Sequence, residues 1–309
     1  MNKRTNVFIP SLFFIMVSLL WSTTNTSFKT LPIAYAQTNA AALASATSVA
    51  TNNNNNNNNN SGATSSNAAS NTANGGLQIK KDVKYFDSAS GYLVYPSTVN
   101  TTGKKVPAII MVHEWWGIND NIRTMANTLA KQAGYVVLAA DLFKGQSTKD
   151  PKQAMQLVKI ITDNPQQSIS NLQAAVKYVS SLPFVDNSKV ASIGWCVGGG
   201  QSLQLALHSE QHPLAATILY YGTPLVTDKQ ELSKIKWPVL GIFGDHDQAN
   251  PLPLINSFKA ALDADGITNQ IQIYKGLGHA FANPSGTNYA PKQTADAWEK
   301  TLAFLKKYV

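Results

Sequence analysis

The residues that are best suited to chemistry surround a single cysteine. Cys196 is the only cysteine among 309 residues, and it lies in the stretch GWCVGGG, with Gly194 and Gly198 two positions to either side. A β-rich run, KVASIGW, leads into this stretch, and a helical run, SLQLALH, follows it. The spacing is that of a nucleophile elbow, G-x-S-x-G, with cysteine in place of serine, and glycines suit such a turn because the chains approach closely there. The alternative is a glycine-rich turn around a small buried cysteine.

A thiol nucleophile needs a base and a second residue that orients the base. In α/β-hydrolases the acid and then the histidine follow the nucleophile along the chain. The run PVLGIF leads into GDHD, which supplies Asp245 and Asp247, and the run IQIYKG leads into LGHAFAN, which supplies His279. The amide of Val197 would point to where an oxyanion forms, and the helix that begins there would favour a thiolate at Cys196.

These groups need a scaffold, and the sequence predicts one from about Leu77 onward. Near-continuous apolar runs alternate with helical patterns, which is typical of a mostly parallel central sheet with helices on both faces. We therefore expect one α/β domain over residues 77–309. The runs LQIKKDVKYF and SGYLVYP are predicted to form an antiparallel hairpin at one edge. Further strands are expected at residues 106–117 (ending in a loop), 135–141, 189–195, 215–222, 238–247 and 269–276.

The first 76 residues have a different character. The start is polar and basic, the apolar run at residues 7–21 is shorter than the ~20 residues that span a bilayer, and AYA at 34–36 fits a signal-peptidase site. We expect residues 1–36 to be a cleaved signal peptide, with an uncleaved membrane anchor as the alternative. The protein would then be exported, either secreted or tethered at the cell surface. Residues 37–76, with nine consecutive asparagines, are expected to be a disordered linker.

Composition argues against several other kinds of protein. The formal net charge of +8 comes from scattered lysines and forms no aromatic-interleaved basic stripe, which argues against a nucleic-acid partner. The tightest groups of metal donors are His113 with Glu114 and His246 with its two flanking aspartates. Neither has the HExxH spacing or a cysteine set, so we expect no metal and no other cofactor.

Taken together, GWCVGGG, GIFGDHD, GLGHAFAN and DLFKG resemble the dienelactone hydrolase family over nearly all of residues 77–309. The resemblance implies an α/β-hydrolase fold and hydrolysis of esters or lactones. The strand-end motif of the family reads G-x-x-D, which selects Asp247 over Asp245. The resemblance also implies that Glu114, in VHEWWG, contacts the resting thiol until substrate binding frees it, and that the backbone amide of Trp115 completes the oxyanion hole.

The sequence departs from the family where the substrate would be recognised. Enzymes that act on dienelactone hold its carboxylate with two arginines, one of them four residues after the catalytic histidine. This sequence has Asn283 there, and it has no arginine between Leu142 and Leu182, where the other would lie. Because the carboxylate clamp is missing, we expect a neutral or aromatic ester or lactone as the substrate. Five aromatic residues are expected to line the pocket: Trp115, Trp116, Phe143, Tyr221 and Phe281.

The resulting hypothesis is a hydrolase with a Cys-His-Asp triad. His279 takes the proton of Cys196, Asp247 orients His279, and the thiolate forms an acyl-enzyme that water then cleaves. A thioesterase or a small peptidase could use the same three residues. A non-catalytic, surface-tethered binding module is the alternative from another class, and the intact triad argues against it.

Overall fold

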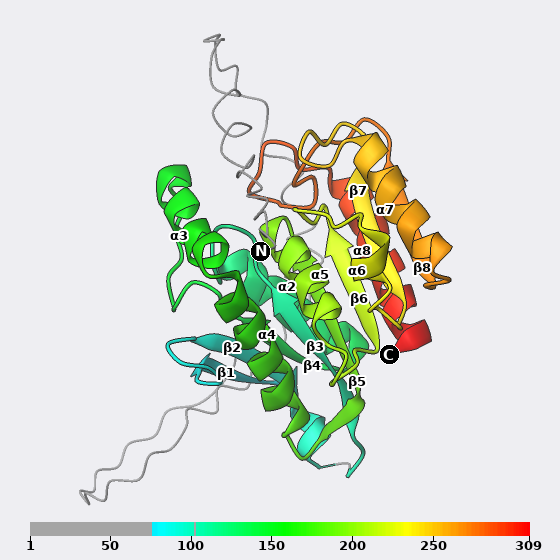
Figure 1. The fold of residues 1–309 in the computed structure, drawn as a ribbon. Coiled ribbons are helices and arrows are strands. Elements are labelled where there is room, and N and C mark those ends of the chain that lie inside the picture. Colours follow the sequence, from blue (N-terminus) through cyan, green and yellow to red (C-terminus); the bar gives the residue numbers. More distant parts are fainter. Residues whose placement is uncertain (1–75, 102) are drawn as a thin grey trace, which may run out of the picture. The chain divides into compact units, whose positions relative to one another are not determined.

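The computed structural model describes residues 76–101 and 103–309, so the predicted leader (1–36) and nearly all of the predicted linker (37–76) lie outside it. In the described residues eight strands form one sheet in the order β1-β2-β4-β3-β5-β6-β7-β8 (Figure 1). The strands are β1 (Leu77–Val83), β2 (Gly91–Pro96), β3 (Val106–Val112), β4 (Val136–Ala140), β5 (Val185–Trp195), β6 (Ala216–Tyr220), β7 (Val239–Gly244) and β8 (Asn269–Tyr274).

The sheet is parallel apart from one edge. β1 pairs with β2 in antiparallel fashion, and β2 pairs antiparallel with β4, so the predicted edge hairpin is confirmed. From β4 to β8 every pairing is parallel. The central strands are buried along almost their whole length because helices cover both faces, which explains their continuous apolar runs.

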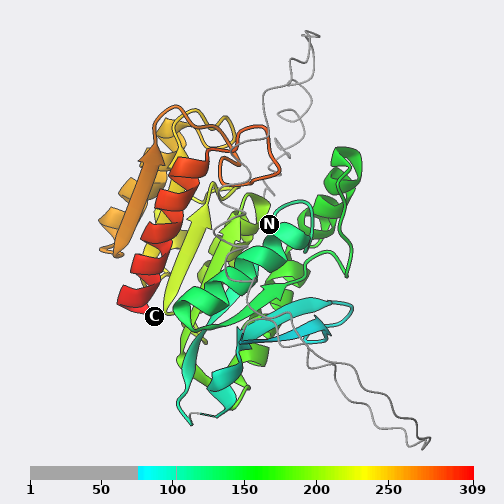
Figure 2. The same cartoon turned by 180° about the vertical axis from the view of Figure 1, so that it is seen from behind.

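The helices divide between the two faces of the sheet (Figures 1 and 2). One face packs against α2 (Asp120–Ala133) and α8 (Pro291–Tyr308). The other packs against α3 (Pro151–Asp163), α4 (Pro165–Ser180), α5 (Val197–Leu207) and α7 (Leu252–Ala264), with the short α6 (Lys229–Leu232) nearby; η2 (Ser97–Asn100) follows β2. No helix in residues 76–101 and 103–309 is long and apolar enough to cross a bilayer.

Local signals set the ends of these helices. The side chain of Asn119 caps α2 by accepting a hydrogen bond from the amide of Ile122, and Gly134 ends the helix in the left-handed conformation at φ 77°. A proline occupies the first turn of α3, α4, α7 and α8, where its missing N–H costs no helical hydrogen bond.

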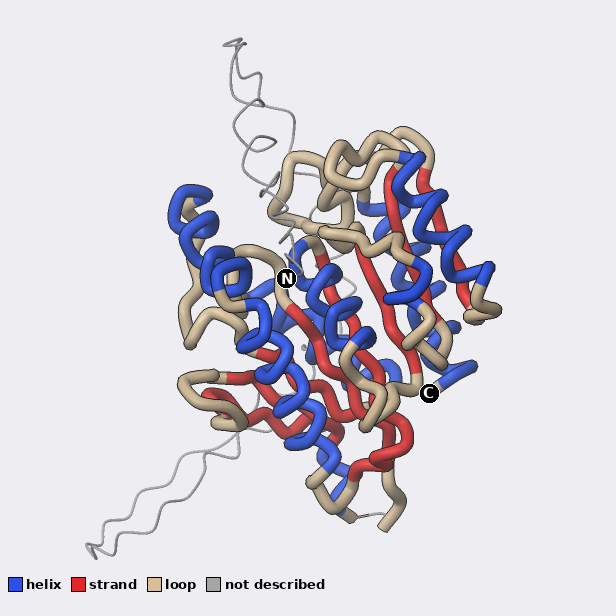
Figure 3. The backbone as a smooth tube through the Cα atoms, viewed as in Figure 1, coloured by secondary structure: helices blue, strands red, loops and turns tan. Residues whose placement is uncertain are grey.

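The parallel strands all run in the same direction, so the loops at their carboxyl ends gather along one edge of the sheet (Figure 3). The residues proposed above for catalysis follow β3, β5, β7 and β8, and they therefore converge at that edge. Such an edge is where open α/β sheets bind their ligands.

Candidate active site

Cys196 occupies the sharp turn between β5 and α5 that the sequence predicts. Its φ of 56° is positive, a conformation that side chains rarely adopt and that costs backbone energy. Hydrogen bonds hold the turn in this shape. The amide of Cys196 donates to the carbonyl of Tyr220 at 3.0 Å, while its carbonyl accepts from the amides of Gly200 at 3.2 Å and Thr223 at 3.0 Å. The turn therefore leaves the thiol projecting from the end of a buried strand.

The glycines on either side are required by close backbone packing. A Cβ on Gly194 would overlap the carbonyl oxygen of Gly198, and a Cβ on Gly198 would overlap the carbonyl oxygens of Val112 and His113. The first turn of α5 thus lies directly against the end of β3. This agrees with the physical reason for expecting glycines around the nucleophile.

His279 and Asp247 lie next to the thiol in a chain of hydrogen bonds. The Nε2 of His279 is 3.1 Å from the Sγ of Cys196, and its Nδ1 is 2.9 Å from the Oδ2 of Asp247. Asp247 is buried, whereas His279 and Cys196 are partly exposed. The three residues come from the loops after β7, β8 and β5, far apart in sequence, and the arrangement is that of a nucleophile, a base and an orienting acid.

His279 and Asp247 each stabilise the charged form of the other. Burial alone would lower the pKa of His279, but the charge of Cys196 and the hydrogen bonds to Asp247 and Cys196 raise this pKa to about 10. Burial would raise the pKa of Asp247, yet the hydrogen bond and charge of His279, aided by Asn250 and Ala249, outweigh it and lower that pKa. These contacts therefore favour the charged imidazolium of His279 beside the carboxylate of Asp247.

Asp245 has a different task from Asp247. Its Oδ1 accepts a hydrogen bond from the amide of Gly276 at 2.6 Å, which ties the loop after β7 to the loop after β8. The geometry thus agrees with the choice of Asp247 that the family motif indicates.

Asn250 is a residue of the site that the sequence reasoning missed. It is fully buried, and its Nδ2 donates to the Oδ2 of Asp247 at 3.2 Å and to the carbonyl of Tyr221 at 3.3 Å. It therefore fixes the carboxylate that orients the histidine. The only sequence signal was its closeness to Asp247 in GDHDQAN.

Glu114 lies in the site but not in the contact that the family resemblance implies. Its carboxylate is 3% exposed and accepts hydrogen bonds from the hydroxyl of Tyr221 at 3.4 Å and from the Nδ2 of Asn283 at 2.6 Å. Among the hydrogen bonds of the described residues, the thiol of Cys196 is paired with His279 and has none to Glu114. Asn283 thus holds the carboxylate of Glu114. Asn283 itself occupies the sequence position, four residues after His279, where enzymes that act on dienelactone have an arginine.

Burial raises the pKa of Glu114 from 4.5 to about 7, against the opposing effects of the charge of His279 and the hydrogen bonds from Tyr221 and Asn283. Because the folded-state pKa lies above the unfolded value, the contribution of Glu114 to the free energy of unfolding is fully present below about pH 4.5. It is lost as the pH rises to about 7. The expected loss from this group is about 3 kcal/mol.

A Glu114→Gln variant should remove this loss, so its free energy of unfolding should fall less than that of the parent between pH 5 and pH 8. Urea unfolding at several pH values measures the difference. The exposed Glu210 provides the matched control, because Glu210→Gln should leave the pH dependence of the parent unchanged. Parallel stability curves for the parent and Glu114→Gln would contradict the prediction.

The aromatic residues expected to line a pocket divide into two groups. Trp115 and Trp116 are partly exposed, with ring centroids 4.6 Å apart, and they are free to meet a substrate. Tyr221 is buried, and its ring packs edge-on against the imidazole of His279 with ring centroids 5.1 Å apart. Phe143 and Phe281 are 0% exposed and belong to the core behind the site, so in this structure they form no exposed pocket wall.

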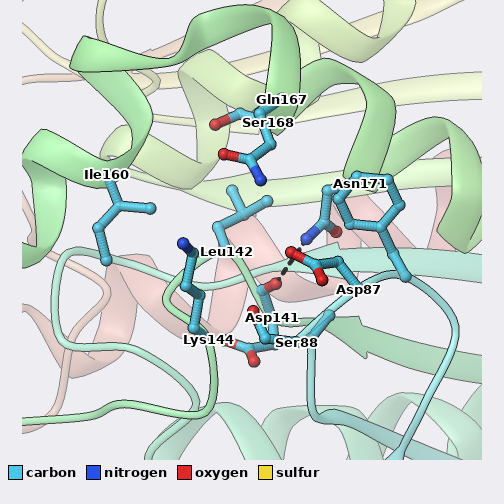
Figure 4. A pocket seen from close by; sticks show the side chains of 11 residues that line it. Asp87, Ser88, Asp141, Leu142, Lys144, Ile160, Gln167, Ser168 and Asn171 are labelled. Atoms are coloured by element: carbon cyan, nitrogen blue, oxygen red, sulfur yellow. Dashed lines mark hydrogen bonds between the residues drawn. The ribbon is translucent and has the colours of Figure 1, made fainter.

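The DLFKG loop is shaped by Asp141. Its carboxylate accepts hydrogen bonds from the amides of Phe143 at 2.9 Å, Gly145 at 2.5 Å and Ser90 at 2.7 Å. A small hollow beside this loop is drawn in Figure 4, where the amine of Lys144 is directed into it. None of the three triad residues lines that hollow.

The two amides expected to form an oxyanion hole are available. Val197 is the first residue of α5, where an amide has no partner within the helix. Neither the amide of Val197 nor that of Trp115 donates a hydrogen bond to any of the described residues. Both groups therefore retain their donor capacity for a ligand.

The sheet order and the nucleophile turn define an α/β-hydrolase fold, and comparison with known proteins places the chain within that class. The model of the dienelactone hydrolase family matches residues 90–309. The chain therefore belongs to the dienelactone hydrolase family, and it is a hydrolase.

Individual relatives agree with this assignment. The chain is 27% identical over 206 residues to a carboxymethylenebutenolidase of Pseudomonas putida, covering 64% of this chain and 85% of that protein. It is 28% identical over 210 residues to the protein usf of Aquifex pyrophilus, covering 66% and 89%. The fold matches the crystal structure of a dienelactone hydrolase-like promiscuous phosphotriesterase from metagenomic libraries, with a TM-score of 0.67, 24% identity, and coverage of 76% and 99%.

Proposed function

We propose that this chain hydrolyses carboxylic esters or lactones through a Cys196–His279–Asp247 triad and a covalent acyl-enzyme. The observation that carries the proposal is the single chain of hydrogen bonds from the thiol through the imidazole to a buried carboxylate, at 3.1 Å and 2.9 Å. Membership of the dienelactone hydrolase family supports the same reaction class.

The steps follow from the geometry. His279 holds the proton of Cys196, and the resulting thiolate attacks the carbonyl carbon of the ester. The negative charge that develops on the carbonyl oxygen is stabilised by the amides of Val197 and Trp115. His279 then gives its proton to the leaving alcohol oxygen, which breaks the ester bond and leaves a thioester on Cys196. Water, deprotonated by His279, cleaves that thioester and regenerates the thiol.

The polar groups of the site favour a substrate without a negative charge. Arg123 is the sole arginine in residues 76–101 and 103–309, and it pairs with Asp120 at 3.1 Å on α2. The amide nitrogen of Asn283 donates to the carboxylate of Glu114, and neither group offers a positive charge to an anionic substrate. We therefore propose that the acyl portion of the substrate is neutral, and the partly exposed Trp115 and Trp116 suit an apolar or aromatic group.

Turnover and trapping of the intermediate test this function together. Reduced full-length protein should hydrolyse p-nitrophenyl acetate and neutral lactones faster than a lactone that carries a carboxylate. Rapid acid quench followed by intact mass measurement should show one added acetyl group, located on the peptide that contains Cys196. Failure to turn over any ester, lactone or thioester, with no adduct, would rule out the proposal. Preference for the anionic lactone would overturn only the neutral-substrate part.

A further inference from the structure

His113, which directly follows β3, is a buried histidine that the proposed mechanism does not use. Its Nε2 lies 3.2 Å from the amide nitrogen of Leu142, and its Nδ1 lies 2.6 Å from the carbonyl oxygen of Glu114. An amide N–H can only donate, so Nε2 accepts and the ring proton must be on Nδ1. The imidazole is therefore neutral and donates from Nδ1 to the Glu114 carbonyl.

The surroundings keep the ring in that form. His113 is 0% exposed, and burial lowers its pKa. Its ring packs against Phe143 with centroids 4.6 Å apart, and Phe143 and Leu142 belong to the loop that Asp141 holds with three hydrogen bonds. The ring thus bridges a rigid loop after β4 to the backbone after β3.

The hydrogen bond from His113 determines the orientation of one peptide group. The carbonyl of Glu114 and the N–H of Trp115 belong to the same planar peptide, and in a trans peptide they point in opposite directions. The carbonyl is held by Nδ1 of His113 and also accepts from the amide of Gly117 at 3.2 Å. The N–H of Trp115 is consequently directed away from the buried ring.

That peptide lies beside the nucleophile turn. A Cβ on Gly198 would overlap the carbonyl oxygen of His113, so the backbone after β3 touches the first turn of α5. The side chain of Glu114 reaches Tyr221, whose ring packs 5.1 Å from that of His279. The Trp115 amide therefore stands at the same side of the molecule as the thiol and its base.

We propose that His113 is a positioning residue for ester hydrolysis, which aims the N–H of Trp115 at the developing oxyanion by holding the carbonyl of Glu114. The loop after β4 supplies the anchor through Leu142. This inference rests on the proposed function, because an oxyanion forms only when a carbonyl is attacked.

Two reactions of the same thiol separate this role from a merely structural one. Ester hydrolysis passes through an oxyanion, whereas alkylation of Cys196 by iodoacetamide displaces iodide at a saturated carbon and needs no oxyanion hole. In the full-length protein, His113→Phe keeps an aromatic ring but loses the donor to Glu114. We expect kcat for p-nitrophenyl acetate to fall about 100-fold, the cost of losing one oxyanion donor, with alkylation at the parent rate.

Two further variants complete the experiment. His113→Gln, whose longer side chain places its amide near the former Nε2, should lose hydrolysis like His113→Phe, and it replaces that variant if the phenylalanine protein does not fold. His113→Asn can place its Nδ2 where Nδ1 lies, so it should recover hydrolysis to within about tenfold of the parent, which is less than the loss of a whole donor.

The proposal is overturned if His113→Phe or His113→Gln keeps parental kcat. It is also overturned if hydrolysis and alkylation fall together, or if His113→Asn is no better than His113→Gln. An inactive parent whose thiol still reacts with iodoacetamide would instead overturn the proposed function, and this inference would fall with it.

Discussion

Cys196→Ala should lower kcat for ester hydrolysis by roughly 10⁶-fold, because no nearby group can replace the thiol as the attacking atom. The thiol is the only one in the chain, and it sits 3.1 Å from the Nε2 of the proposed base. Hydrolysis of p-nitrophenyl acetate by reduced parent and variant, measured at equal protein concentration, checks the prediction.

The fold should survive this change. Alanine removes the sulfur atom of a partly exposed cysteine and leaves the backbone hydrogen bonds of the turn in place. Circular dichroism and the urea midpoint should therefore match the parent closely. Equal rates for folded parent and folded Cys196→Ala would show that hydrolysis, if any, does not use the thiol.

Asp247→Asn should lower kcat by about 10⁴-fold, since an asparagine would present an N–H to Nδ1 of His279 and favour the wrong tautomer. The loss of the carboxylate charge should also lower the pKa of His279, which the hydrogen bond to Asp247 and the charges of Asp247 and Cys196 together raise to about 10 in the parent. Alkylation of Cys196 by iodoacetamide near pH 7 should then slow as well, because His279 becomes a weaker base toward the thiol.

Asp245 supplies the matched control two residues away. Its carboxylate accepts from the amide of Gly276, a bond that the Oδ1 of an asparagine also accepts. Asp245→Asn should therefore keep kcat close to that of the parent. If the two variants lost activity equally, the orienting role assigned to Asp247 would be wrong.

Much of the fold can be predicted from the sequence because each strand is a short apolar run between turn residues. The hairpin at the edge and the parallel core follow from that pattern. The ends of elements are less predictable. β5 begins at Val185 and not at Lys189, because Val185 pairs with Val106 across the sheet. The sequence does not indicate this start, since residues 187–189 are exposed and show no alternation.

The shape of the turn at Cys196 could be predicted from the sequence because local geometry imposes its residue types, whereas contacts between distant residues could not be predicted. The positive φ and crowding at the thiol demand glycines nearby, so the nucleophile turn is visible in sequence. No local pattern pairs Glu114 with Asn283, which are 169 residues apart. Phe143 and Phe281 were expected at the pocket surface, but aromatic residues in loops also fill cores, and composition alone does not distinguish the two.

The long sequence separations within the site have a consequence for biosynthesis. The thiol and its proposed base are 83 residues apart in the sequence. During translation the nucleophile turn emerges well before β8 and the histidine that follows it. Contacts between residues so far apart in the sequence form late in folding. A nascent or truncated chain would carry the cysteine without the proposed base. Under the proposed mechanism, hydrolysis therefore requires that the entire sheet, through β8, has been assembled.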